Sequence, residues 1–178
     1  MRRYRHGLVI GKFYPFHLGH SHLIRTAIEA CDVVTVQVLA SSVESIPGAQ
    51  RAAWIQAEYP FATVVWAMDD AEVDYASDAA WEAHLSVIRG LLAGAPVDAV
   101  FTSDDYGAEL AARLDAAWVQ VDPGRRINPI SGRAIRADFN GMWWALPAIV
   151  QQDLEEYRRG AQRLVEPLPE SGSTHSSA

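Results

Sequence analysis

Short apolar runs rich in β-branched residues alternate along the chain with longer segments whose apolar residues recur every three or four positions. The first pattern is typical of buried strands and the second of helices with one apolar face. Strands are predicted over 6–11, 33–40, 62–68, 97–103 and 117–122. Helices are predicted over 19–30, 48–59, 106–114 and 78–94, the last with Asp78 as N-cap and Gly94 just past its final turn. This alternation predicts an α/β fold, a five-stranded parallel sheet with helices on both faces.

The C-terminal part of the chain follows a different pattern. Residues 130–163 are predicted to be helical, with Pro147 in a first helical turn. Residues 165–178 have almost no apolar side chains, which predicts a disordered tail. The remaining 1–164 are predicted to form one domain, since a chain of 178 residues can bury one core of ordinary size.

Composition narrows the functional classes. The net charge of −7 argues against a nucleic-acid partner, because such proteins usually carry a basic face. A single cysteine, Cys31, cannot form an intrachain disulfide, and we expect it to be buried at the end of an apolar helix stripe. No apolar run approaches the ~20 residues of a membrane helix. We therefore expect a cytoplasmic protein with no membrane partner, and whether it forms a homo-oligomer stays open.

The stretch GKFYPFHLGH, residues 11–20, is the turn between the first predicted strand and the first predicted helix. In parallel sheets ligands bind outside the carboxyl ends of the strands, and the first such turn commonly borders that crevice. Lys12, the only lysine among fifteen basic residues, ends the strand. Gly19 leaves the free N–H groups of a helix start open to anions. With His17 and His20 reaching the same point, the turn predicts a polyphosphate site.

Two simpler interpretations of the histidines remain. They can be ordinary polar surface at a helix start, or, with His22, part of a metal site, although the sequence suggests no further ligands for one. The chain also has no G-x-x-x-x-G-K-[ST] motif and therefore no P-loop.

The G-x-F-x-P-x-H-x-G-H pattern resembles the H-x-G-H signature of the nucleotidyltransferase superfamily. With F-Y-P-F-H it is most similar to nicotinamide mononucleotide (NMN) adenylyltransferases, and above all to the adenylyltransferase half of bifunctional bacterial proteins that also carry a ribosylnicotinamide kinase. The resemblance covers about residues 7–150. It implies a Rossmann-like nucleotidyltransferase fold and a site in which Lys12, His17 and His20 are catalytic and Gly11 and Gly19 lie against ATP phosphates.

A second motif, NPISGRAIR, spans residues 128–136. Ser131 is a good N-cap for a short helix, on which Arg133 and Arg136 share one face and present forked donors to phosphate. A capped surface helix with solvated arginines is the alternative. The resemblance assigns phosphate binding to Ser131 and Arg136 and makes Arg133 a variable position. Gly132 departs from the usual I-S-S-T-x-I-R ending, although I-S-G-x-x-I-R occurs in the bifunctional branch.

The acceptor side is less strongly marked. The resemblance places Phe13, Arg51 and Trp81 near the mononucleotide, with the Trp81 ring stacked on nicotinamide. Arg51 can equally be a solvated helix residue, and Trp81 can belong to the core. Asp104 and Asp105 follow the fourth strand, where they can order water around magnesium, contact a ribose or cap the next helix.

Together these residues predict an adenylyltransferase that makes NAD and pyrophosphate from ATP and NMN. The acceptor phosphate is already an anion, so positioning and charge stabilisation supply most of the catalysis. Mg²⁺ is the expected cofactor, bound mainly through the substrate phosphates rather than through protein ligands. The alternatives are the same chemistry on another phosphorylated acceptor, such as nicotinate mononucleotide, and a non-catalytic nucleotide sensor.

Overall fold

The computed structural model describes residues 3–165, and in it strands alternate with helices as the sequence predicts. The strands are β1 (Tyr4–Gly11), β2 (Cys31–Ala40), β3 (Thr63–Met68), β4 (Ala99–Thr102) and β5 (Ala117–Gln120). The α-helices are α1 (Leu18–Ala30), α2 (Gly48–Glu58), α3 (Asp78–Leu92), α4 (Tyr106–Arg113), α5 (Gly132–Ala137) and α6 (Ala148–Val165). Two short 3₁₀ helices, η1 (Pro123–Arg125) and η2 (Trp143–Ala145), lie between them.

The five strands form one parallel sheet in the order β3-β2-β1-β4-β5. The chain builds outward from β1 to β3 and then returns to the other side of β1 with β4. The strand order therefore reverses between β1 and β4, and the carboxyl ends of these two strands mark the place where such sheets bind ligands.

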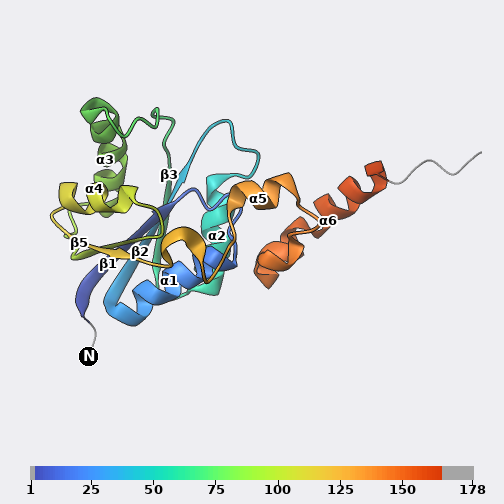
Figure 1. The fold of residues 1–178 in the computed structure, drawn as a ribbon, viewed down its shortest axis with the longest axis horizontal. Coiled ribbons are helices and arrows are strands. Elements are labelled where there is room, and N and C mark those ends of the chain that lie inside the picture. Colours follow the sequence, from blue (N-terminus) through green and yellow to red (C-terminus); the bar gives the residue numbers. More distant parts are fainter. Residues whose placement is uncertain (1–2, 166–178) are drawn as a thin grey trace, which may run out of the picture.

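Helices cover both faces of the sheet, as predicted (Figure 1). Successive residues of β1 point to opposite layers: Val9 packs in the core under α1, α2 and α6, and Leu8 in the core under α3 and α4. Both side chains are fully buried. The central strand thus has apolar contacts on both sides, which holds its carboxyl end in a fixed position.

Some predicted boundaries were wrong. Helix α1 begins at Leu18 with His17 as its N-cap, one residue before the predicted start. Ser77, rather than Asp78, caps α3, because its side chain accepts the N–H of Ala80. The chain leaves α3 at Ala93 in a left-handed conformation.

The segment 130–163 is not continuously helical, because α5, η2 and α6 are separate elements. Cys31 is buried as predicted, but it is the first residue of β2 rather than the end of a helix. Of the predicted disordered tail, Val165 is the last residue of α6, and 166–178 lie outside the described residues.

Candidate active site at the carboxyl end of the sheet

A cavity of about 390 Å³ opens at the carboxyl ends of the strands. Each strand contributes a residue at or just past its end, namely Gly11, Ser41, Asp69, Thr102 and Asp122. On one side of β1 the wall is completed by the start of α1 and the segment that leads into α5. On the other side it is completed by α3 and the chain before it. The cavity thus extends to both sides of the end of β1.

The two histidines of the first turn form a reciprocal cap at the start of α1. The backbone N–H of His20 donates to Nδ1 of His17, and the backbone N–H of His17 donates to Nδ1 of His20, both at 3.3 Å. The rings stack with their centroids 3.6 Å apart. Since each Nδ1 accepts a hydrogen bond, each neutral ring carries its proton on Nε2. Both residues line the cavity, and the cap leaves the Nε2–H of each ring out of its own hydrogen bonds.

Both rings are held in the neutral form. Burial, helped by the nearby Arg125 cation, lowers the pKa of His17 to about 4. Burial also lowers the pKa of His20 well below its usual value, with further contributions from His17 and Arg125. Protonation of either Nδ1 would in addition remove the capping hydrogen bond that it accepts. At neutral pH the pair therefore acts as hydrogen-bond donors and not as cations.

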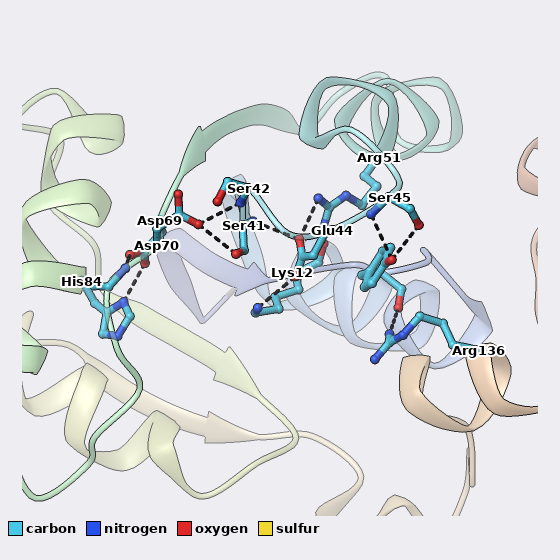
Figure 2. A network of polar contacts seen from close by, with 12 residues as sticks. Lys12, Ser41, Ser42, Glu44, Ser45, Arg51, Asp69, Asp70, His84 and Arg136 are labelled. Atoms are coloured by element: carbon cyan, nitrogen blue, oxygen red, sulfur yellow. Dashed lines mark hydrogen bonds and ion pairs between the residues drawn. The ribbon is translucent and has the colours of Figure 1, made fainter.

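Positive charge at the end of β1 comes from Lys12, which is tied to a buried carboxylate (Figure 2). Its Nζ donates to Glu44 at 2.9 Å, and its side chain is 59% exposed while that of Glu44 is 6% exposed. Burial alone would raise the pKa of Glu44, but hydrogen bonds from Lys12, the Ser41 backbone and Arg51 lower it overall. Glu44 thus keeps its charge and holds Lys12 at the cavity wall.

Arg51 does not reach the cavity. Its side chain is fully buried, where Nη1 donates to the Lys12 carbonyl at 2.6 Å and Nη2 lies 2.8 Å from a Glu44 oxygen (Figure 2). The predicted contact of this side chain with the mononucleotide or its phosphates stays a prediction, and it would require the side chain to leave these partners. Arg51 instead positions Lys12 and Glu44.

Helix α5 approaches the first turn from the other side. The Ser131 hydroxyl caps it by accepting the N–H of Ala134 at 3.1 Å, as predicted. Arg136 donates to the Tyr14 carbonyl, and its guanidinium lies 4.4 Å from the centre of the Tyr14 ring. A Cβ at Gly132 would collide with the same carbonyl. The departure from the family pattern at Gly132 thus allows α5 to lie directly against the first turn.

The far side of the cavity is aromatic and acidic. Trp81 and Tyr75 line it, with ring centroids 5.9 Å apart. Trp81 is only 7% exposed and also packs in the core beneath α3. Nearby, Nδ1 of His84 is paired with Asp69 at 2.7 Å. A flat ring that enters this side of the cavity therefore meets aromatic surface and negative charge.

The structure brings most of the predicted residues together. The predicted site residues that line the cavity are Gly11, Lys12, His17, Gly19, His20, Trp81 and Ser131. Phe13, Arg51 and Arg136 are not among the lining residues. Phe13 is buried in the core against Phe16 and His20, and its predicted contact with the mononucleotide stays a prediction. Asp104 lines the cavity, whereas Asp105 accepts a hydrogen bond from Gln120.

Arg125 is among the cavity residues that the sequence analysis missed. It lies in η1 after β5, and its guanidinium forms an ion pair with Asp104 at 3.0 Å. The signal was the turn sequence DPGRR, since aspartate, proline and glycine predict a tight turn at the end of the last strand. An arginine carried on such a turn points back to the carboxyl edge of the sheet.

Two structural searches complete the description of the site. Among residues 3–165 no group of three or more His, Cys, Asp or Glu side chains is arranged to hold a metal ion. Within the same range no helix is both long enough and apolar enough to cross a membrane.

Comparisons with known proteins find similarity in structure but not in sequence. No protein-family model matches the chain, and no curated protein matches it either. A structure of NadR protein in complex with NAD and AMP-PNP superposes with a TM-score of 0.58 over 80% of this chain and 45% of that one, at 15% identity.

A second similar structure is a bifunctional NMN adenylyltransferase/ADP ribose pyrophosphatase from Francisella tularensis. Its TM-score is 0.57 over 76% of this chain and 42% of that one, at 17% identity. The chain thus spans less than half the length of both proteins. The expected Rossmann-like fold is confirmed: this chain shares a five-stranded parallel α/β fold with the structures of NadR and of the Francisella protein.

Proposed function

We propose that the chain is an adenylyltransferase that joins the AMP part of ATP to NMN and releases pyrophosphate. The observation that carries the proposal is the His17–His20 cap, which holds two neutral rings at the cavity that Lys12 also lines and uses only their Nδ1 atoms. Hydrogen-bond donors suit an α-phosphate whose oxygens gain negative charge in the transition state.

The reaction needs no protein nucleophile. A phosphate oxygen of the acceptor attacks the α-phosphorus of ATP, a new P–O bond forms, and the bond to the β-phosphate oxygen breaks in line with it. His20 donates to the α-phosphate as charge builds there, and His17 holds the neighbouring phosphates. Positioning of the two substrates supplies much of the rate.

The triphosphate is held by charge and by a helix start. Lys12 exchanges its Glu44 partner for phosphate oxygens, and the free N–H groups of α5 beyond Ser131 face the leaving pyrophosphate. Arg136 contacts phosphate only after leaving the Tyr14 carbonyl, so its proposed role requires a side-chain movement. Gly11 and Gly19 leave room for the phosphates at the cavity wall.

The carboxylates at the cavity fit a Mg²⁺ ion bound mainly by substrate. Mg²⁺ keeps several waters and commonly takes one or two carboxylates plus phosphate oxygens, so a site without a three-residue ligand group is compatible with it. When bound, Mg²⁺ neutralises charge on the triphosphate.

The acceptor is proposed to occupy the side of the cavity that contains Trp81. A nicotinamide ring can stack there. The negative charges of Asp69 and Asp70 attract its cationic pyridinium and would repel the carboxylate of nicotinate mononucleotide. A similar structure, that of NadR protein in complex with NR, belongs to a protein with 19% identity to this chain.

A panel of phosphorylated acceptors scored by pyrophosphate release tests the proposal. We expect release with ATP, Mg²⁺ and NMN, less with nicotinate mononucleotide, and no phosphorylation of nicotinamide riboside. Pyrophosphate release with an acceptor other than NMN, and none with NMN, would support adenylyl transfer but assign a different acceptor. ATP binding without release for every acceptor would indicate a nucleotide sensor.

A further inference from the structure

Arg125 is held at the cavity by an unusual turn. Three of its residues have left-handed backbone conformations, with φ of 49° at Asp122, 70° at Gly124 and 52° at Arg125. The Asp122 carboxylate fixes the turn by accepting the backbone N–H groups of Ile127 and Asn128, both at 2.8 Å. Left-handed conformations at residues other than glycine cost energy, and they are enriched at functional sites. The turn therefore holds Arg125 at a defined place.

That place faces the histidine pair. Arg125, His17 and His20 line the same cavity. The pKa of His17 is lowered mainly by burial and next by the charge of Arg125. The pKa of His20 is lowered mainly by burial, next by His17 and then by Arg125. A cation that acts on both rings adds positive potential to the cavity that all three residues line.

The guanidinium of Arg125 has only a weak partner in the structure. Within residues 3–165 its one hydrogen bond goes from Nη2 to Asp104 at 3.0 Å. The two side chains are 43% and 53% exposed, and ion pairs this exposed contribute little to stability. A guanidinium has five N–H donors in a planar fork that suits phosphate oxygens better than a single carboxylate oxygen does. A polyphosphate can therefore displace Asp104.

We propose that Arg125 is a further catalytic residue, which leaves Asp104 when ATP binds and donates to the α- and β-phosphate oxygens beside His20. Asp104 holds the guanidinium at the cavity while the site is empty. During transfer the acceptor oxygen–phosphorus bond forms and the bond to the pyrophosphate oxygen breaks, while Arg125 stays protonated and changes only its hydrogen bonds. The inference rests on the proposed adenylyl transfer.

Adjacent residues provide matched control variants for the test. Arg125→Ala is compared with Arg126→Ala, because Arg126 is exposed and is not among the cavity-lining residues. Asp104→Asn is compared with Asp105→Asn, because Asp105 is bonded to Gln120 instead.

We expect Arg125→Ala to lower kcat/KM for ATP by about 100-fold at an unchanged melting temperature, and guanidinium ion added to the assay to restore part of it. Arg126→Ala should stay within about twofold of the parent. Asp104→Asn should lower the KM for ATP, because the carboxylate no longer competes for the guanidinium, and Asp105→Asn should not. An Arg125→Ala enzyme within threefold of the parent would overturn the inference.

Two measurements keep this test separate from that of the proposed function. If the parent protein releases no pyrophosphate with any acceptor, the proposed function fails, and ATP affinities of the two arginine variants still test Arg125. In the ligand-free protein, NMR titration should show a higher His17 pKa in Arg125→Ala and an unchanged one in Arg126→Ala. Equal ATP affinities together with an unshifted His17 pKa in both variants would contradict the inference without any assay of turnover.

Discussion

His17 combines two roles that one side chain can fill only when it is uncharged. Its Nδ1 caps α1 by accepting the N–H of His20, and its Nε2–H is left for a ligand in the cavity. Burial keeps the ring neutral, with a pKa of about 4. The stability of the fold and the chemistry of the site therefore depend on the same protonation state.

This coupling predicts an acid-sensitive fold. The unfolded chain takes up a proton on His17 below pH 6.5, whereas the folded protein does not until about pH 4. The contribution of neutral His17 to the free energy of unfolding is fully present above pH 6.5 and is lost as the pH falls toward 4. Between pH 7 and pH 5 the loss amounts to about 2 kcal/mol.

Urea unfolding at the two pH values measures the loss in the parent and in His17→Asn. Asparagine is a good N-cap that does not titrate, so the variant should lose about 2 kcal/mol less than the parent over this interval. The same loss in both proteins would show that His17 is not buried in the neutral form.

Lys12 offers a chemical test, because it is the only lysine of the chain and its side chain is 59% exposed. An amine-reactive reagent has two targets, Lys12 and the amino terminus. Modification at Lys12, located by peptide mass spectrometry, should abolish activity, and Mg²⁺–ATP should protect Lys12 but not the terminus. Labelling of Lys12 at the same rate with and without ATP would place it outside the phosphate site.

At the scale of elements, the sequence predicted which helices and strands form better than it predicted where each begins and ends. All five strands and the first four helices were found, because their periodicity extends over whole segments. The start of α1 was misplaced by one residue because histidine is not a usual N-cap, and the reciprocal cap depends on two rings stacking. The break of 130–163 into α5, η2 and α6 depends on tertiary packing that periodicity does not reveal.

Gly132 tests the contact between α5 and the first turn. In Gly132→Ala the new Cβ meets the Tyr14 carbonyl, so α5 must shift, at a cost of about 1–3 kcal/mol, and the KM for ATP should rise. Gly90→Ala is the matched control, because it lies in α3 with no atom within 4 Å of the added Cβ and should gain up to about 1 kcal/mol. Thermal unfolding and ATP titration measure both effects. A Gly132→Ala protein as stable as the parent would contradict the close contact.

Trp81 on α3 separates acceptor binding from core packing. If its ring stacks on the acceptor, Trp81→Leu should raise the KM for NMN severalfold and leave the KM for ATP nearly unchanged. Trp81→Phe keeps an aromatic ring and should therefore raise the KM for NMN much less. Steady-state kinetics with each substrate varied in turn gives both constants. Equal increases for the two substrates, together with a lower melting temperature, would assign Trp81 to the core alone.

At the scale of the whole molecule, the site lies where the topology predicts it. The reversal of strand order between β1 and β4 brings the first turn, the end of β4 and the turn after β5 to one edge of the sheet. Sequence reasoning found the first turn and the Ser131 helix because each has a motif. It did not predict the burial of Phe13 and Arg51, since burial of a side chain behind a turn depends on packing from elements far along the chain. It missed Arg125 because the turn sequence DPGRR predicts a tight turn but not which side chain the turn brings to the cavity.

The central claim is that this edge of the sheet transfers the adenylyl group of ATP to an acceptor phosphate. Incubation of the protein with Mg²⁺, NMN and ATP labelled at the α-phosphorus tests it most directly, with His20→Ala as the comparison. We predict that the label moves into NAD with one pyrophosphate released per dinucleotide, and that His20→Ala binds ATP normally but turns over about 100-fold more slowly. Label that stays in ATP with NMN and with every other phosphorylated acceptor, or full turnover by His20→Ala, would contradict the account.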